Sequence, residues 1–474
     1  MAKDLRSFLN GYEAAHPESV LRLKKEISSN QEVTALVMKL GKEEKYPVLI
    51  CENIVTCAGN KSSFPLVTNL LASRTRCAES IDSTFRNMHL DFFNKTRQGA
   101  IKPEVLSRAE APVKQVVKTG QQVDLTQTPA LYHHYMDPGP YFTAGFLTTY
   151  DPDTGIDNCA LQRGWIYDAR TVRCYPYTVS HNWLNMRKNR DRGQPTRMAY
   201  WLGHHPATCI AAQARLGYPE SHFAAMGGVL GEALRLVPSE TLGNDFMVPA
   251  DAEVVVEGIM HSYDLWPEGP FGEYGGYIGP QVANPQFEVT AITHRKDAYW
   301  HDILVGHPDN QTMGGPAMEA AVYESVKQRI PSLRNVYIPL SGTCRFHVYL
   351  QLENPWRGDA REAIMAALTV DFRLKHAFVF DMDIDIFDER EVLFAIATRS
   401  QWDRDVMIFP KVKAPIIDPS ATYDVGAKGG IDCTKPVGED FSELNTVDLE
   451  IMQSVNISDY VSPEQFARMP IERM

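Results

Sequence analysis

Hydrophobic and polar positions follow two different periods in the first part of the chain. Apolar residues recur at helical spacing over residues 5–12 and 32–40, which predicts two amphipathic helices. The short apolar run at residues 46–51 is typical of a buried strand. Residues 1–115 are therefore predicted to form an N-terminal α/β segment.

The pattern changes between residues 141 and 310. Short runs rich in β-branched and aromatic residues occur at 142–150, 253–259 and 288–293, and the run at 175–180 is also strand-like. Closely spaced strands of this kind predict a barrel-like or sandwich-like middle domain. The stretch 103–140 carries many Pro and Gly residues and is predicted to be a connector.

Helical spacing returns at residues 316–328 and 361–368, and strand-like runs follow at 345–352 and 377–380. This alternation predicts an α/β C-terminal domain. The acidic segment from Asp381 to Asp388 is not a calcium loop, because its sixth position is Ile386 rather than Gly. It is predicted instead to end a strand and cap a helix that starts near Glu389. A helical tail that caps the fold or contacts a second copy is predicted after Thr446.

Composition narrows the class of protein. The chain has 474 residues, a length that predicts two or three domains. Its net charge of -12 disfavours non-specific nucleic-acid binding, which needs a basic surface. No apolar run approaches the length of a membrane span, and the first residues lack a signal-peptide core. The eight cysteines are scattered with no C-x-x-C pair, which predicts reduced thiols and a cytoplasmic location.

The segment from Trp266 to Tyr277 concentrates candidate chemistry. Glu268 and Glu273 lie among Gly and Pro residues, so a shaped loop is predicted rather than a helix. Phe271, Tyr274 and Tyr277 are expected to supply apolar walls beside the two acids. A carboxylate desolvated by aromatic rings is suited to proton transfer, although an isolated pair of this kind is more often simply solvated.

Two further residues are candidates with open alternatives. Arg163 offers two parallel donors suited to a carboxylate, or it is a structural arginine paired with an acid. His181 is either a ligand or a satisfied polar residue. If residues 158–163 are extended, Asn158 and Arg163 lie on opposite faces unless a bulge intervenes.

These pieces occur in a familiar order, and the chain resembles the UbiD family of prenylated-FMN-dependent decarboxylases over nearly its whole length. The resemblance rests on Asp151-Pro-Asp-Thr-Gly155 with Asn158 and Arg163, on Ser180-His181, and on Glu268-Gly-Pro-Phe-Gly-Glu273. It rests also on Val248-Pro-Ala-Asp-Ala-Glu-Val-Val-Val-Glu-Gly258, Asp383-Ile-Asp-Ile-Phe-Asp388 and Ala427-Lys-Gly-Gly-Ile-Asp432.

The resemblance implies roles for matching positions. Arg163 would orient the substrate carboxylate, Glu268 would hold Arg163, and Glu273 would donate the proton that replaces carbon dioxide. Asn158 and His181 match two ligands of a divalent ion, usually manganese, and a potassium ion commonly lies nearby. The implied cofactor-binding residues are Asn158, Cys159, Leu161, Gln162, Arg163, Ser180, His181 and Lys428.

The chain departs from the family pattern at the third metal ligand. That ligand is normally a Glu, and the alignment places His222 there. His is a competent manganese or zinc ligand, so the departure bears on the identity of the metal more than on its presence. Glu220, two residues away, is the alternative.

The implied fold is an α+β or α/β multidomain protein with a split β-barrel flavin domain and an α/β C-terminal domain. The predicted boundaries are 1–115, 116–315 for the flavin domain, 316–445 for an α/β oligomerisation domain, and 446–474 for the helical tail. A homodimer or higher homo-oligomer is expected, with a flavin prenyltransferase as cofactor supplier.

The implied activity is reversible, non-oxidative decarboxylation of an aromatic, heteroaromatic or α,β-unsaturated acid. Prenylated FMN would act as a 1,3-dipole that forms a transient covalent adduct and accepts the charge left by carbon dioxide. A small ring acid is favoured over a polyprenylated one, because no long apolar groove is evident. The alternative is a flavin- and metal-binding relative that acts as a metal-dependent hydrolase or lacks decarboxylase activity.

Overall fold

The computed structural model describes residues 2–176, 180–422 and 424–469. Residues Met1–Thr434 form one compact unit, and Lys435–Met474 form a second, smaller one. The strand-like run expected at 175–180 includes residues 177–179, which lie outside the described residues. The next helix, α5 (His181–Asp191), begins after Ser180, whose hydroxyl accepts a hydrogen bond from the Trp183 backbone.

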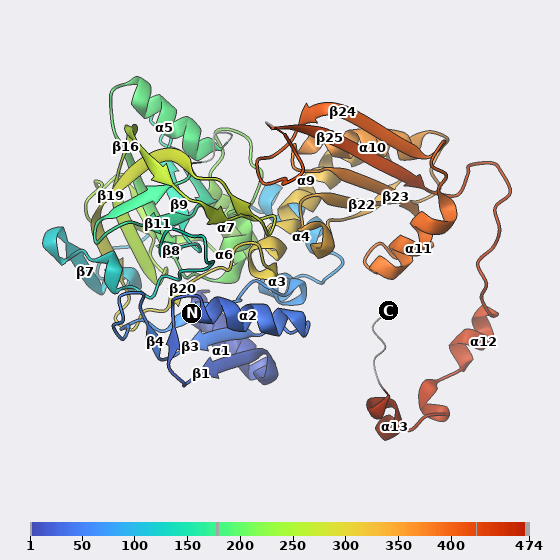
Figure 1. The fold of residues 1–474 in the computed structure, drawn as a ribbon, viewed down its shortest axis with the longest axis horizontal. Helices are drawn as coiled ribbons and strands as arrows, with labels where there is room; N and C mark the ends of the chain where they lie inside the picture. The colour runs from blue at the N-terminus through green and yellow to red at the C-terminus, as the bar shows by residue number, and fades with distance from the viewer. Residues whose placement is uncertain (1, 177–179, 423, 470–474) are drawn as a thin grey trace. The chain divides into compact units, whose positions relative to one another are not determined.

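The N-terminal region contains a four-stranded sheet with helices packed around it (Figure 1). The helices predicted at 5–12 and 32–40 are present as α1 and α2, and Asp4 and Ser7 form a capping box at the start of α1. The strands of this sheet, in order, are β1 (Val20–Leu23), β3 (Val48–Cys51), β5 (Leu66–Thr68) and β20 (Trp300–His301). The helices of this region are α1 (Leu5–Ala15), α2 (Glu32–Lys42) and α3 (Arg74–Ser80), and the next helix, α4 (Met88–Arg97), packs against α7 (His222–Leu230) and α9 (Gly315–Lys327).

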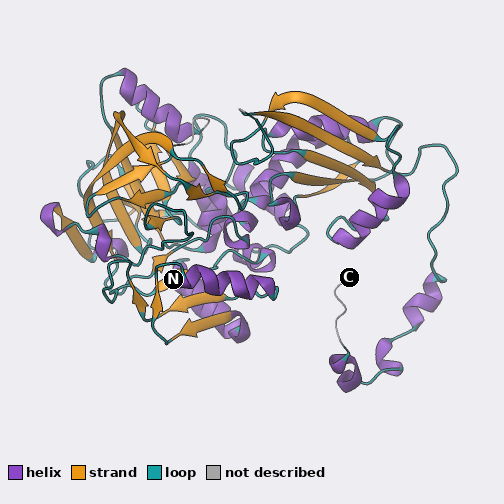
Figure 2. Ribbon diagram, in the orientation of Figure 1, coloured by secondary structure: helices purple, strands orange, loops and turns teal. Residues whose placement is uncertain are grey.

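The middle of the chain forms a nine-stranded antiparallel sheet that curls into a half-barrel (Figure 2). Its order is β10 (Asp157–Leu161), β9 (Phe146–Tyr150), β13 (Thr196–Leu202), β16 (Val254–Glu268), β19 (Val282–His294), β12 (Thr171–Cys174), β11 (Gly164–Ile166) and β8 (Tyr141–Phe142), with β7 (Val116–Thr119) paired to β19. The strand predicted at 142–150 is two strands, because the chain breaks at residues 143–145. The predicted split-barrel fold is confirmed.

Side-chain alternation explains how this sheet is buried on both faces. In β13, Tyr200 and Leu202 enter one apolar cluster with Val254 and Val256 of β16. Trp201, which points the other way, enters a second cluster that includes helices α6 (Pro206–Ala211) and α7 (His222–Leu230). Both faces of these strands therefore carry apolar side chains, so their sequences are continuous apolar runs. The curled sheet, buried on both sides, is a rigid frame for the loops at its ends.

The C-terminal part of the first unit is a five-stranded sheet with helices on both faces (Figure 1). Val348 and Leu350 pack with helices α9 and α10, whereas Tyr349 between them packs with α11. The strands, in order, are β21 (Leu333–Tyr337), β22 (His347–Leu352), β23 (His376–Asp381), β25 (Val425–Cys433) and β24 (Val406–Lys413). The helices are α9 (Gly315–Lys327), α10 (Asp359–Val370) and α11 (Glu389–Arg399), and Asp388 caps α11 as predicted.

Shorter elements complete the fold. The small strands are β2 (Ile27–Ser28), β4 (Ile54–Val55), β6 (Glu104–Val105), β14 (Arg235–Pro238), β15 (Met247–Pro249), β17 (Phe271–Gly272) and β18 (Ile278–Gly279). The first unit also has α8 (Pro308–Thr312) and the 3₁₀ turn η5 (Leu340–Gly342). The second unit has α12 (Leu449–Ser454), η6 (Ile457–Asp459) and α13 (Pro463–Arg468), so the predicted helical tail is three short segments.

Two further observations bear on composition. All eight cysteines carry free thiols. Within the described ranges, none of the helices is both long enough and apolar enough to cross a membrane.

Gly258 is a position where the fold needs the absence of a side chain. It lies at a register shift in β16, and a Cβ there would lie 2.1 Å from the carbonyl oxygen of Glu288 and 2.7 Å from the Phe287 ring. We therefore expect Gly258→Val to lower the free energy of unfolding by about 3 kcal/mol, measured by urea denaturation. Gly11 in α1 has open space around its Cβ position, so Gly11→Ala is the control and should be neutral or slightly stabilising. Equal stability of the two variants would contradict the prediction.

Candidate active site

Arg163 is held between two carboxylates that come from distant parts of the chain. It lies in the short link between β10 and β11, Glu268 is the last residue of β16, and Glu273 follows β17. Arg163 Nε and Nη2 donate to the two oxygens of Glu268 at 2.9 and 2.8 Å, and Nη1 donates to Glu273 Oε1 at 2.6 Å. The structure thus brings the three expected catalytic residues into direct contact.

Glu268 is the fixed member of this group. Its side chain is fully buried, and besides the two bonds from Arg163 it accepts a hydrogen bond from the Tyr141 hydroxyl at 3.0 Å and from Asn284 Nδ2 at 3.3 Å. A buried carboxylate needs hydrogen-bond donors of this kind, and four of them hold it in one position. Glu268 is therefore suited to hold Arg163 in place.

Glu273 has a different environment. Its side chain is 18% exposed, and its recorded side-chain hydrogen bond is the one from Arg163. Gly279 leaves room for it, since a Cβ at that position would lie 2.6 Å from the Glu273 Cγ. Glu273 is therefore held by fewer contacts than Glu268 and is more accessible from solvent.

Aromatic rings cover the Arg163 guanidinium on two sides. Its carbon lies 4.5 Å from the ring centres of both Tyr175 and Phe271. Burial opposes the positive charge of Arg163, but Glu273 and Glu268 together hold its pKa above the ordinary range. The guanidinium is thus permanently charged and orientationally fixed.

The loop after Glu273 is anchored through Tyr274. Its hydroxyl donates to the Gln311 carbonyl at 2.9 Å, and Gln311 Nε2 donates back to the Tyr274 carbonyl at 3.0 Å. The Arg345 guanidinium lies 4.5 Å from the Tyr274 ring centre. Phe271 and Tyr274 line a cavity as expected, but Tyr277 is 63% exposed and forms no part of its wall.

Two cavities meet at this site. The first, of about 240 Å³, contains Arg163 and Glu273, with apolar walls from Phe271, Ile416 and Ile417. The second, of about 520 Å³, is lined by Asn158, Cys159, Leu161, Gln162, Ser180, His181 and His222 among others. The cavities share four lining residues, Leu161, Gln162, Arg345 and Arg373.

Asn158 and Arg163 thus open into neighbouring cavities. The strand β10 ends at Leu161, and the Gln162 backbone continues its register with a hydrogen bond to the Gly145 carbonyl at 2.8 Å. Arg163 lies just beyond this pairing, and β11 begins at Gly164.

The second cavity contains the candidate metal donors. Asn158 Nδ2 donates to Asn182 Oδ1 at 2.6 Å, which leaves the Asn158 carbonyl oxygen available as a ligand. His222 Nδ1 is buried without a hydrogen-bond partner, and burial lowers the pKa of His222 to about 4, so the ring is neutral at pH 7. A neutral imidazole with an unpartnered nitrogen is what a metal site requires.

Glu220 and Lys428 are not among the residues that line the two cavities, although the Glu220 carboxylate is close enough to His181 to act on its pKa. Glu220 accepts a hydrogen bond from the Gly217 backbone at 3.1 Å and pairs with Arg97 at 3.5 Å, and it is not among the cavity-lining residues. Lys428 donates to the carbonyls of Leu368 at 2.6 Å and Asp371 at 2.9 Å, behind the wall that Asp371 forms. The described residues contain no cluster of three or more His, Cys, Asp or Glu side chains able to hold a metal, so a site here needs Asn158.

Several residues of this site are not evident from the sequence. Tyr141 supports Glu268 from 127 positions away, and Arg215, Arg345 and Arg373 line the second cavity from three separate segments. None of them belongs to a local motif. Only the meeting of the elements brings them together.

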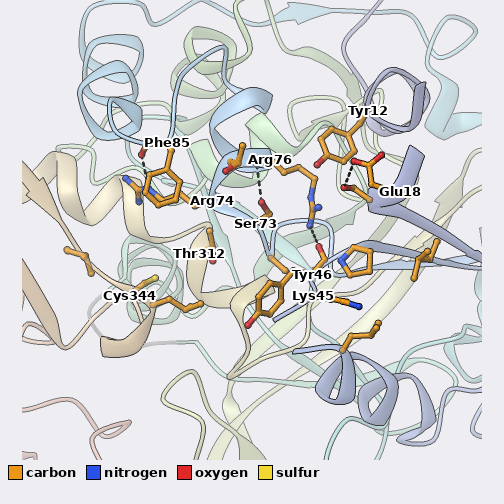
Figure 3. A pocket seen from close by; sticks show the side chains of 18 of the residues that line it. Tyr12, Glu18, Lys45, Tyr46, Ser73, Arg74, Arg76, Phe85, Thr312 and Cys344 are labelled. Atoms are coloured by element: carbon orange, nitrogen blue, oxygen red, sulfur yellow. Dashed lines mark hydrogen bonds between the residues drawn. The ribbon is translucent and has the colours of Figure 1, made fainter. Parts of the chain in front are cut away.

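A third cavity, of about 640 Å³, lies away from these residues (Figure 3). It contains two arginines with structural partners. Arg74 pairs with Glu319 at 2.8 Å, and Arg76 donates to the backbone carbonyls of Leu70, Tyr46 and Asn69. Because these cations are already engaged, this cavity is a weaker candidate for chemistry than the first two.

Models of three protein domains match the chain in succession. They are the N-terminal domain of 3-octaprenyl-4-hydroxybenzoate carboxy-lyase over residues 15–89, its Rift-related domain over 104–308, and its C-terminal domain over 311–433. An anhydromevalonate phosphate decarboxylase from Methanosarcina mazei is 31% identical over 402 residues, which cover 84% of this chain and 89% of the relative. Its counterpart from Methanothermobacter thermautotrophicus is 29% identical over 430 residues, covering 89% and 95%.

Solved structures show the same fold. The UbiD-class enzyme HmfF from Pelotomaculum thermopropionicum, in complex with FMN, is 31% identical with a TM-score of 0.89, covering 97% of this chain and 100% of that one. The 3,4-dihydroxybenzoic acid decarboxylase of Klebsiella pneumoniae, at 22% identity and a TM-score of 0.86, covers 98% and 100% and supports the fold alone. With its family models, its relatives and its fold in agreement, the chain belongs to the UbiD family and is a carboxy-lyase of the prenylated-FMN-dependent class.

Proposed function

We propose that this protein catalyses the reversible, non-oxidative decarboxylation of a small aromatic, heteroaromatic or α,β-unsaturated carboxylic acid. The size and lining of the first cavity support a small substrate. Its volume is about 240 Å³, and it combines a buried cation with apolar walls. A small unsaturated acid matches this combination, whereas a polyprenylated one exceeds it.

The unequal environments of the two glutamates carry the proposal. Glu268 is fully buried and accepts four side-chain hydrogen bonds, so we assign it the role of fixing Arg163. Glu273 has one such bond and is partly exposed in the first cavity, so we assign it the proton transfer. Two carboxylates in contrasting environments are the usual basis for dividing an acid role from a charge-stabilising role.

Each side chain then has one task. Arg163 orients the substrate carboxylate through its guanidinium. When the substrate binds, the hydrogen bond from Arg163 Nη1 to Glu273 breaks, and Nη1 then donates to the substrate. Phe271 and Tyr175 exclude water from the guanidinium and strengthen its electrostatic interactions. Glu273 delivers the proton from its carboxyl oxygen to the carbon that has lost carbon dioxide, and in the reverse direction it removes that proton.

The residues present fit a flavin with an anionic end. Asn158, Cys159, Leu161, Gln162, Ser180 and His181 would hold the cofactor in the second cavity, and Lys428 would support the wall formed by Asp371. When bound, prenylated FMN supplies an electron sink for the charge that decarboxylation leaves on carbon. A divalent ion such as manganese would be held by Asn158, His181 and His222, with potassium nearby.

The names of relatives leave the substrate open. Several similar curated proteins are anhydromevalonate phosphate decarboxylases, while HmfF and 3,4-dihydroxybenzoic acid decarboxylase share the fold. An evolved form of HmfF that binds prenylated FMN is a dimer. We propose that this protein also forms a homodimer or a larger homo-oligomer, with residues 316–445 as the oligomerisation domain. The C-terminal tail would contact a second copy, since its apolar residues Leu449, Ile451 and Phe466 are exposed. A flavin prenyltransferase would supply the cofactor.

Replacing the proposed proton donor should abolish turnover without removing the flavin. Glu273→Gln keeps the size of the side chain and its hydrogen bond with Arg163 but cannot donate a carboxyl proton, so kcat should fall by roughly 10²–10⁴-fold. Flavin absorbance of the purified protein should be unchanged. Glu288→Gln, on an exposed side chain of β19, is the control and should retain activity. Decarboxylation at the wild-type rate by the Glu273 variant would refute the assigned role.

The two candidates for the third metal ligand can be separated by metal content. His222→Ala should lower manganese bound after desalting by about tenfold or more, because loss of a ligand weakens affinity at least as much as loss of its support. Glu220→Ala should leave manganese content unchanged, since its carboxylate pairs with Arg97. Elemental analysis of protein produced with manganese measures both. The reverse ranking would assign the site to Glu220.

A further inference from the structure

A row of three side chains crosses one end of the half-barrel sheet, one from each of three neighbouring strands. Tyr141 of β8 pairs in register with Trp165 of β11, and Trp165 pairs with Arg173 of β12. Residues directly opposite each other in a sheet project from the same face and lie close together. The Tyr141 and Trp165 rings are stacked with an interplanar angle of 21°. Trp165 and Arg173 have no part in the proposed function.

Arg173 carries a buried charge without a carboxylate partner. The residue is 6% exposed, its Nε is buried with no hydrogen-bond partner, and it forms no ion pair with any carboxylate in the described ranges. Three aromatic rings surround the guanidinium instead. Its carbon lies 3.8, 4.8 and 5.5 Å from the ring centres of Tyr167, Trp165 and Trp266. Cation–π contacts of this kind offset part of the cost of burying the charge.

The hydrogen bond from Arg173 leads to the catalytic group. Nη1 donates to the backbone carbonyl of Pro267 at 2.8 Å, and Pro267 is the residue before Glu268. Proline has no N–H and gives no donor to the strand ladder. Residues 263–267 of β16 are exposed, whereas Glu268 is buried, so burial does not hold this part of the strand. Arg173 therefore anchors β16 at the point where the strand enters the protein interior.

The other end of the row holds the side chain of Glu268. The Tyr141 hydroxyl donates to Glu268 Oε1 at 3.0 Å. Trp165 is confined between the two ends of the row, because a Cβ at Gly139 would lie only 2.8 Å from Trp165 Nε1. The row thus fixes the backbone before Glu268 at one end and the carboxylate of Glu268 at the other.

Stability alone does not account for a charge at position 173. An apolar side chain of similar length would fill the space between the three rings without the cost of removing a cation from water. An apolar side chain cannot supply the donor to the Pro267 carbonyl, nor the charge that strengthens this hydrogen bond. The comparison favours a positioning role for Arg173 over a packing role.

We propose that Arg173 is a positioning residue that holds the end of β16, so that Glu268 keeps Arg163 aligned with the substrate carboxylate. Arg173 lines neither of the two cavities, and it acts through Pro267 and through its neighbours in the row. A displacement of about 1 Å in a substrate-orienting group is enough to lower turnover about a hundredfold. Because this inference rests on the proposed roles of Glu268 and Arg163, its first test needs no substrate.

Hydrogen exchange of the full-length protein measures how firmly the end of β16 is held. Deuterium uptake is followed by mass spectrometry in peptides that span residues 266–276. Arg173→Met keeps the length of the side chain but removes its charge and its donors. Exchange in this segment should then be about tenfold to a hundredfold faster, as expected for loss of a hydrogen bond from a charged group. Arg173→Lys keeps the charge and a donor, so its exchange should stay within about threefold of the wild type.

The ranking of the two variants separates positioning from packing. If Arg173 only fills space, the apolar Met side chain serves at least as well as Lys. Positioning predicts faster exchange in Arg173→Met than in Arg173→Lys, with the same midpoint of urea unfolding in both variants and the wild type.

Arg197→Met is the matched control. Arg197 is also an arginine of the half-barrel sheet and lies 5.9 Å from the Phe246 ring centre, but it pairs with Asp245 at the surface. Its variant should leave exchange in residues 266–276 unchanged. Two results for Arg173→Met would overturn the proposal: exchange equal to the wild type, or exchange that is faster throughout the protein together with a lower unfolding midpoint.

The second test is turnover of the holoenzyme with a panel of small aromatic, heteroaromatic and α,β-unsaturated acids. Arg173→Met should lower kcat by about tenfold or more while the flavin absorbance of the purified protein is unchanged, and Arg173→Lys should retain most of the turnover. Adding Tyr141→Phe to Arg173→Met should lower log kcat by less than the sum of the two separate losses, because both side chains act on Glu268.

The outcomes of the two tests are distinct. A wild-type kcat in Arg173→Met would overturn the proposal. If the wild-type protein decarboxylates none of the acids, the proposed function fails, and hydrogen exchange alone decides whether Arg173 holds the end of β16.

Discussion

The buried guanidinium of Arg163 is the constraint on which the rest of the site depends. A permanent charge removed from water is tolerated only with close counter-charges, and losing one partner of such a pair typically costs about 3–5 kcal/mol. Glu268 meets this need with two parallel hydrogen bonds and is itself held by Tyr141 and Asn284. The end of β16 must therefore reach the link between β10 and β11, and the curled sheet is the frame that brings them together.

The two cavities have opposite electrostatic character around this centre. On one side, two glutamates pair with one arginine, so the carboxyl groups outnumber the guanidinium group. On the other, Arg215, Arg345 and Arg373 line the cavity with one aspartate, Asp371, which pairs with Arg215 and Arg373. The shared wall of Leu161, Gln162, Arg345 and Arg373 joins them. A molecule with an anionic end and a conjugated end is complementary to this gradient, and the UbiD-class relative HmfF binds FMN.

Local patterns predicted most elements but not their limits. The apolar run at 253–259 indicates a strand, yet β16 continues to Glu268 through the exposed residues His261, Leu265 and Trp266. Backbone pairing with β19 sustains this extension rather than burial, so no apolar pattern reveals it. In the same way, the apolar run at 142–150 does not reveal that it belongs to two strands, β8 and β9, because the residues of both strands are buried.

The sequence by itself determined which elements form and which acids and arginine are candidates, because helical and strand periods and a Gly-rich loop are local properties of the chain. It also indicated the family through motifs in order. Only the tertiary structure decided that Glu268 and Glu273 differ in environment, that His222 lines the cavity while Glu220 pairs with Arg97, and that Arg215 and Arg373 share Asp371. Burial and charge balance depend on neighbours supplied by remote segments, and no spacing along the chain records them.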